Sequence, residues 1–351
     1  MIQKLLCSLR YSSGLLSRRW RRFAGGRAGV ILTYHRVDPP SSEPPIGGAS
    51  LYGIERGVPL DVFERQLRFM LRRFEPCALG DLFRPGRGRP GFAVTFDDGY
   101  ADNLSFAAPL LAQLGIPATI FLSSEFVGTN RRFWWETLGA MFRETKVPEL
   151  RVPPLRAPAH LKSALSGPLP LGDPGARERS HWLISEALMR TPPEEIDARL
   201  VELAKLLGVP VRRESRDAPL LDWEGVRKLE RSGFEIGAHG ADHWNLGLLS
   251  RAAALDQIER SFARIARELG RRPRSFAYPY GGPEHRPVDA AGLLEEVGCQ
   301  IAVTTDLGVA TQEQSRYLLP RAGLTRGDAF ACAYQLESAF RATELALHVG
   351  G

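Results

Sequence analysis

GFAVTFDDGY, at residues 91–100, is an apolar, β-favouring run that ends in two adjacent aspartates and a glycine. Phe92, Val94 and Phe96 are typical of a buried strand, and Asp97 and Asp98 follow it directly. Neighbouring carboxylates repel each other, so in a cleft the pair needs a cation, hydrogen-bond donors or a proton. A solvated Asp-Asp-Gly turn is the alternative for this stretch taken alone.

Apolar runs of the same kind recur along the chain, and each ends in polar or glycine residues. They are GVILTYHRV (29–37), FAVTFDDG (92–99), ATIFLSS (118–124), FEIGAHG (234–240), SFAYPYG (275–281) and CQIAVTTD (299–306). Helical spacing of apolar residues lies between many of them, for example over 61–74 and 250–270. Alternating strands and helices predict a parallel α/β construction, and continuous apolar strands predict burial on both faces.

The stretch from about 125 to 220 interrupts this alternation. It contains the sequence FWWETL, a Pro/Gly-rich segment and two helical patterns. We expect a largely helical insertion at about 125–220 in a body that spans 29–351. Trp134 and Trp135 are expected to anchor this insertion by packing, with stacking on sugar rings as the alternative.

The composition is ordinary for a globular protein, but the net charge of +6 is unevenly placed. Seven of the 46 basic residues and none of the 40 acidic ones lie in 1–28, so the remainder has a net charge of −1. A near-neutral body argues against a nucleic-acid-binding surface. Four scattered cysteines without a CxxC pair predict neither a disulfide framework nor a cysteine zinc site, and they favour a reducing, cytoplasmic location.

Residues 1–28 interleave arginines with leucines and Trp20. This pattern predicts an amphipathic segment in peripheral contact with an anionic membrane, on the inner membrane face. A disordered basic tail and an organellar transit peptide are the alternatives. No apolar run is long enough to predict a secretory signal or a membrane span.

Two histidines stand four residues apart in GFEIGAHGADHWNL (233–246). Imidazoles at this spacing can face the same way and, with a carboxylate, form an open three-ligand metal site. HxxxH alone is a weak signal, but together with the strand-end aspartates it predicts such a site. Asp98 can then be a ligand that the cation neutralises, while Asp97 stays ionised and takes a proton from a water molecule.

With these motifs the sequence resembles the polysaccharide deacetylases, or carbohydrate esterase family four, which include the nodulation-type chitooligosaccharide deacetylases. TFDDGY (95–100) matches the first motif of that family, HGADH (239–243) the second and YPYGG (278–282) the third. The resemblance implies that Asp97 is the catalytic base and that the backbone N–H of Tyr280 helps to hold the oxyanion. It implies three metal ligands, which are Asp98, His239 and His243. It also implies a distorted, incomplete (β/α) barrel of about seven strands.

Two positions depart from the family pattern. Ala277 stands where an Arg usually opens the third motif, and the C-terminal Leu-x-His motif that supplies a general acid is not found. His35 is the best substitute for the acid, because it ends the first apolar strand and would lie on the same barrel rim. The YHxV strand there resembles the exopolysaccharide-type branch, whose motifs are permuted and whose His takes this role. Arg321, at the end of YLLPR, is the candidate to replace the missing Arg beside Asp97.

The predicted function is that of a metal-dependent amidohydrolase. It would remove N-acetyl groups from an N-acetylated sugar in a polysaccharide, an oligosaccharide or a glycan intermediate, and release acetate. Zinc is the first choice of ion, and cobalt, nickel or iron also suit a His₂Asp site. The alternatives are a deacylase or deformylase that acts on a lipid-linked amino sugar, and an inactive glycan-binding barrel. The inactive protein would show a broken metal triad or a lost base, and this sequence shows neither.

Overall fold

A computed structural model describes residues 20, 27–40, 57–214, 220–324 and 329–349. The predictions for residues 1–28 therefore fall largely outside the described residues. The chain divides into two compact units. The first takes in the described residues of Met1–Pro40, Val58–Gly128 and Leu220–Gly351, and the second takes in Gly57 and the described residues of Thr129–Pro219.

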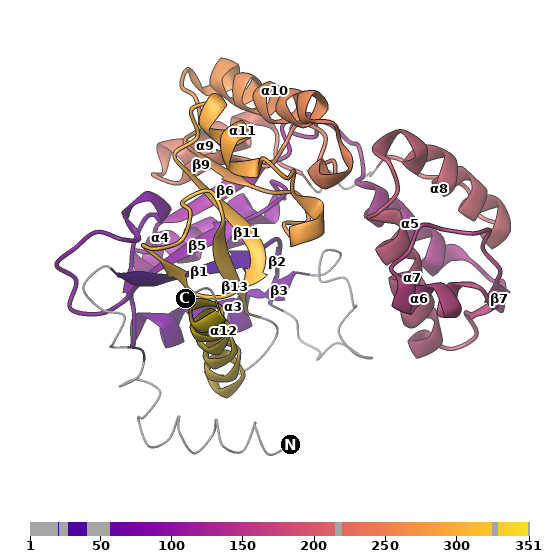
Figure 1. Cartoon of the computed structure of the whole chain (residues 1–351), viewed down its shortest axis with the longest axis horizontal. Helices are drawn as coiled ribbons and strands as arrows, with labels where there is room; N and C mark the ends of the chain where they lie inside the picture. The colour runs from indigo at the N-terminus through magenta and orange to yellow at the C-terminus, as the bar shows by residue number, and fades with distance from the viewer. Residues whose placement is uncertain (1–19, 21–26, 41–56, 215–219, 325–328, 350–351) are drawn as a thin grey trace. The chain divides into compact units, whose positions relative to one another are not determined.

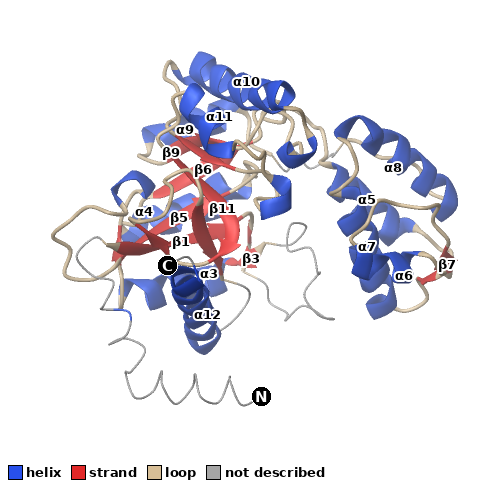
Figure 2. Ribbon diagram, viewed as in Figure 1, coloured by secondary structure: helices blue, strands red, loops and turns tan. Residues whose placement is uncertain are grey.

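The first unit is built on a ring of parallel strands (Figures 1 and 2). In ring order, which is also chain order, these are β1 (Ala28–Tyr34), β5 (Gly91–Phe96), β6 (Ala118–Leu122), β9 (Glu235–Ala238), β10 (Ser275–Ala277), β11 (Ile301–Leu307) and β13 (Leu319–Gly323). Because β1 pairs with both β5 and β13, the ring of seven described strands closes. The predicted (β/α) barrel of about seven strands is confirmed, and it is incomplete only in having one strand fewer than the eight of a full barrel.

Helices follow most of these strands, as a (β/α) barrel requires. The longer ones of this unit are α3 (Leu60–Leu71), α4 (Ala108–Leu114), α9 (Trp223–Arg231), α10 (Arg251–Leu269), α11 (Ala290–Glu296) and α12 (Ala329–Val349). Single turns are η1 (Leu79–Asp81), the π-helical η2 (Asn103–Ala107), η3 (Leu246–Leu248) and η4 (Pro283–His285). Short strands β4 (Glu75–Pro76) and β12 (Ala310–Thr311) extend the sheet, and β2 (Val37–Asp38) pairs with β3 (Val58–Pro59). No helix among the described residues is both long and apolar enough to cross a membrane.

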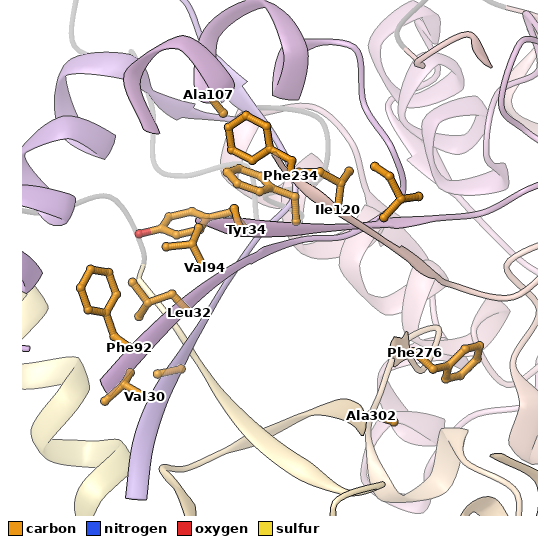
Figure 3. Close-up of a cluster of buried hydrophobic side chains, with 14 of the residues drawn as sticks. Val30, Leu32, Tyr34, Phe92, Val94, Ala107, Ile120, Phe234, Phe276 and Ala302 are labelled. Atoms are coloured by element: carbon orange, nitrogen blue, oxygen red, sulfur yellow. The ribbon is translucent and has the colours of Figure 1, made fainter. Parts of the chain in front are cut away.

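Side chains of the barrel strands alternate between two cores, because successive residues of a strand point to opposite faces. Val30, Leu32 and Tyr34 of β1 belong to the larger core, which Figure 3 shows in part. Ile31 of β1 and Ala93 of β5 belong to a separate cluster with residues of the same parity on the other strands. The residues of this second set therefore point into the barrel.

Gly237 on β9 leaves room for one of these interior side chains. A Cβ atom there would lie 2.4 Å from the Phe121 ring and 2.7 Å from Ser275 Oγ. Phe121 is fully buried, so it cannot swing out to solvent. We infer that glycine is needed at this position for the barrel interior to pack.

The seventh strand, β13, is missing from the apolar runs that the sequence shows. Pro320 and Arg321 interrupt its hydropathy, yet both are buried. The six predicted runs each overlap one of the other six strands of the ring, with boundaries that differ by up to four residues.

The second unit is mainly helical. Its elements are α5 (Trp134–Glu144), β7 (Glu149–Leu150), α6 (Ala159–Leu165), β8 (Leu169–Pro170), α7 (Pro174–Leu188) and α8 (Pro193–Leu207). They surround their own apolar core, in which Leu138, Ile184 and Leu203 are buried. Trp135 is buried and stacks on Phe133, with ring centroids 4.4 Å apart.

Candidate active site

Polar side chains gather at the carboxyl ends of three barrel strands and in the middle of a fourth. His35 and Asp97 follow β1 and β5, His239 follows β9, and Arg321 lies on β13. Each stands an even number of positions from an inward-pointing residue of its own strand, so its side chain lies on the same, inward-facing side of the sheet. Since the strands are parallel, these ends meet at one rim of the barrel.

Asp98, His239 and His243 form a buried group at this rim. Asp98 Oδ1 lies 3.4 Å from His239 Nε2 and 3.3 Å from His243 Nε2. One ligand atom of each residue lies within 4.8 Å of the others. Atoms that bind a tetrahedral ion at about 2.0–2.2 Å stand about 3.3–3.6 Å apart, so the two measured separations match this geometry.

The protonation of this group also suits a metal ion. His239 Nδ1 lies 2.7 Å from the carbonyl oxygen of Ala277, to which it donates, and this leaves the lone pair on Nε2. Asp98 Oδ1 is buried and receives no hydrogen bond in the described structure, a cost that a cation would remove. Burial raises the pKa of Asp98, but His239, His243 and His35 together outweigh this effect and the net pKa is lowered, so the carboxylate is ionised. The three residues could therefore hold a divalent ion.

Asp97 is held by Arg321 rather than by this group. Arg321 Nη1 donates to Asp97 Oδ1 at 2.8 Å, and Nη2 donates to Oδ2 at 2.6 Å. Two further donors of the guanidinium are also bound: Nε donates to the Thr304 carbonyl at 2.7 Å, and Nη1 donates to Thr95 Oγ1 at 3.1 Å. Such a two-pronged pair fixes the carboxylate plane. The structure thus places Arg321 where the sequence predicted a replacement for the missing Arg.

The charge state of Asp97 follows from the same contacts. Burial raises its pKa, but Arg321, His239 and His35 together outweigh this effect, and the net pKa is lowered. Asp97 is therefore ionised at neutral pH and able to accept a proton. A carboxylate with a lowered pKa is a weak base, so it needs a water molecule that has itself been made more acidic.

His35 and Tyr280 complete the predicted set. His35 Nε2 lies 4.0 Å from Asp97 Oδ2, and the His35 side chain is 32% exposed. The Tyr280 ring lies edge-on to the His243 ring, with centroids 4.8 Å apart. The structure therefore brings all seven predicted site residues to one rim.

Strained backbone conformations are concentrated at the predicted site. Among the described residues, the non-glycine residues with positive φ are Asp98 (75°), His243 (55°) and Tyr280 (61°). Left-handed backbone is costly for residues with a Cβ atom and persists where the surrounding structure enforces it. All three lie in the predicted site, two as predicted metal ligands and one at the predicted oxyanion donor.

Several residues that support the site carry no signal in the sequence. Thr95 and the Thr304 carbonyl complete the environment of Arg321. Asn245 Nδ2 lies 2.8 Å from His285 Nδ1, and the His285 ring lies 5.5 Å from that of Tyr280. Isolated polar residues of this kind have no motif, so only the tertiary structure reveals them.

Comparison with protein families gives one match at this site. The family model "Polysaccharide deacetylase" matches residues 86–147 and 206–300. These ranges contain Asp97, the three possible metal ligands and Tyr280, whereas His35 and Arg321 lie outside them. A search of curated proteins finds no match.

Solved structures give a likeness of fold. The Streptococcus pyogenes deacetylase PplD, in complex with acetate, is similar with a TM-score of 0.54 and 14% identity, over 88% of this chain and 98% of that one. IcaB from Ammonifex degensii is similar with a TM-score of 0.50 and 18% identity, over 89% of this chain and 98% of IcaB. At such identities the likeness concerns the fold alone.

Proposed function

Since this chain belongs to the polysaccharide deacetylase family and is therefore an amidohydrolase, we propose that it removes N-acetyl groups from an N-acetylated sugar of a polysaccharide or oligosaccharide and releases acetate. We propose further that it works with a divalent ion, zinc first, held by Asp98, His239 and His243. The position of His35 at the end of β1 supports a substrate of the exopolysaccharide type.

One observation carries this proposal: two adjacent carboxylates have separate partners. Asp98 faces two imidazoles, while Asp97 is gripped by Arg321. Of the two adjacent aspartates, Asp98 is thus suited to bind a cation, and Asp97 is kept ionised beside it. A structural turn would need neither arrangement.

The chemistry divides among these residues. When bound, a divalent ion supplies Lewis acidity, which lowers the pKa of a water molecule and polarises the acetamide carbonyl. Asp97 accepts a proton from a water molecule while the oxygen of that water molecule bonds to the carbonyl carbon. The backbone N–H of Tyr280 donates to the carbonyl oxygen as negative charge develops there.

His35 acts on the other side of the reaction. As the C–N bond breaks, its imidazolium gives a proton to the nitrogen, because an amine leaves poorly as an anion. The acetyl group departs with the water oxygen as acetate, and the sugar keeps a free amine. Arg321 touches no reacting atom and holds Asp97 in place.

Acetate release from a panel of N-acetylated oligosaccharides tests this function. We expect metal-stripped protein to be inactive and stoichiometric zinc to restore release. Loss of the restored activity in His239→Ala, but not in the control His181→Ala, would assign the effect to the proposed site. Equal acetate release by stripped and reconstituted protein would overturn the proposal.

A further inference from the structure

The segment that carries His35 is held by the turn that follows the two aspartates. Asn103 Nδ2 donates to the His35 carbonyl at 2.9 Å and to Asp102 Oδ1 at 3.1 Å. Asp102 Oδ1 also accepts from the Val37 amide at 3.1 Å, and Asp102 Oδ2 accepts from Arg36 Nε at 2.8 Å. Two neighbouring side chains thus bind three successive residues, which are the two residues between β1 and β2 and the first residue of β2.

Further contacts tie the same two segments together. The Arg36 guanidinium lies over the Tyr100 ring, 4.8 Å from its centroid, and Tyr100 follows the Asp-Asp-Gly turn directly. The Asp97 amide donates to the Tyr34 carbonyl at 3.0 Å. The base and the proposed acid therefore share one hydrogen-bonded framework, although about 60 residues of chain separate them.

The imidazole of His35 is only partly covered by its surroundings. Its side chain is 32% exposed, whereas Asn103 is fully buried and Asp102 is 8% exposed. One neighbour of the imidazole is Asp97, whose Oδ2 lies 4.0 Å from His35 Nε2. The position of a partly exposed ring depends on the position of its main chain, and the main chain here is held by Asn103 and Asp102.

We propose that Asn103 and Asp102 are positioning residues that hold the His35 imidazole at the distance from Asp97 which proton donation to the leaving nitrogen requires. This inference rests on the proposed function, in which His35 is the general acid. We call the hydrogen bonds that Asn103 and Asp102 make to residues 35–37 the clamp. A misplacement of about 1 Å can cost about 10²-fold in rate, so loss of the clamp should impair proton donation by His35. A purely structural role would instead lower stability and affect all substrates alike.

The test compares two substrates with different needs for acid. We expect Asn103→Ala to lower kcat on an N-acetylated oligosaccharide by about 10–10²-fold. On 4-nitrophenyl acetate, whose leaving group departs with little help, we expect less than about a threefold loss. Metal content and the circular dichroism spectrum should match those of the wild type.

A double-variant cycle shows whether Asn103 acts through His35. The variant His35→Ala/Asn103→Ala should hydrolyse the oligosaccharide within about threefold of His35→Ala alone, because the residue that the clamp positions is already gone. If the loss of activity in the double variant equals the product of the losses in the two single variants, the proposal is overturned. The control Thr145→Val also removes a buried bond to a carbonyl, from Thr145 Oγ1 to Leu207 at 2.7 Å, but in the second unit, and it should leave the ratio of the two activities unchanged.

The two hypotheses fail in different ways. If His35→Ala shows no selective loss on the oligosaccharide, the assignment of the acid is wrong. If His35→Ala shows that loss and Asn103→Ala does not, the clamp is wrong while the acid stands. Should Asn103→Ala fold poorly, Asp102→Asn takes its place, because an amide oxygen still accepts from Val37 while the ion pair with Arg36 is lost. A selective loss in Asp102→Asn that is smaller than the loss in His35→Ala would then support the positioning role. The absence of any selective loss would overturn it.

Discussion

Each unit of this chain buries a histidine, but His239 and His181 have different surroundings. His239 lies in the barrel beside two carboxylates, and although burial lowers its pKa, Asp97 and Asp98 reverse this and raise it. His181 lies in the helical unit against the Phe142 ring, with centroids 5.0 Å apart. Burial, helped by Arg143, lowers the pKa of His181 to about 4.

The same contrast holds for the two units as wholes. In the first unit the buried side chains include Asp97, Asp98, Asp102 and Arg321. Among the described residues of 129–214, the buried polar side chains are threonines, serines and His181, and none is acidic. Burial by itself therefore does not mark a functional site, whereas burial together with opposite charges does. The experiments below test this distinction.

The largest effect is expected from removing a histidine of the metal group. His239→Ala should bring metal content down from about one equivalent per chain and abolish turnover, because one of three ligands is lost. His181→Ala is the matched control, since it also truncates a buried histidine. It should lower stability but keep the metal, as measured by elemental analysis. Equal metal content in the two variants would remove the distinction between the units.

Asp97→Asn should give the next largest effect. The amide keeps the shape of the side chain but cannot accept the proton, so we expect kcat to fall by about 10²–10⁴-fold while most of the metal stays bound. Asp173→Asn is the control in the helical unit. Asp173 caps α7 by accepting from the Ala176 amide, and asparagine caps a helix equally well. Near-normal turnover of Asp97→Asn would exclude it as the base.

Arg321→Met tests the buried ion pair itself. Leaving Asp97 buried without its cation should lower the free energy of unfolding by about 3–5 kcal/mol, measured by urea denaturation. Adding Asp97→Asn to this variant removes the uncompensated charge, so the double variant should regain much of the stability. It should not regain activity, because the base is gone. A double variant as unstable as Arg321→Met would show that the guanidinium matters for packing rather than charge.

The sequence predicts the parts of the site that sit at ends of apolar runs. Asp97, Asp98 and His239 stand out because each is polar and follows a strand whose hydropathy is continuous. The same runs predict a parallel α/β construction, while the barrel is implied by the resemblance to the deacetylase family, and the closed ring of strands confirms it. The roles of the individual residues remain predictions that the variants above test.

Features that depend on distant contacts are not visible in the sequence. The strand β13 has a proline and a buried arginine in its middle, so its hydropathy does not indicate a strand. The burial of Arg321 makes sense only once Asp97, more than 200 residues away, is placed beside it. Asn103 likewise reads as one of many polar residues after a turn until its bond to the His35 carbonyl is seen.

The smallest effect concerns the pH dependence of the helical unit. Because the folded state lowers the pKa of His181 to about 4, against about 6.5 in the unfolded chain, the unfolded state binds more protons between these values. The stability that neutral His181 contributes is thus present above about pH 6.5 and is lost as the pH falls toward 4. We expect a loss of about 2 kcal/mol between pH 7.5 and pH 5.

Urea unfolding of His181→Leu at the two pH values isolates this contribution. Leucine is close to histidine in size and does not titrate, so the difference in free energy of unfolding between pH 7.5 and pH 5 should shrink by about 2 kcal/mol relative to the wild type. The readout is this difference and not the absolute stability, which the substitution also changes through lost contacts. His160→Gln removes an exposed histidine of the same unit and should leave the difference unchanged. An unchanged difference in His181→Leu would mean that the folded unit accepts a charged imidazole. The helical unit, like the barrel, would then hold its buried histidine in surroundings that tolerate a positive charge, and the contrast drawn between the two histidines would fail.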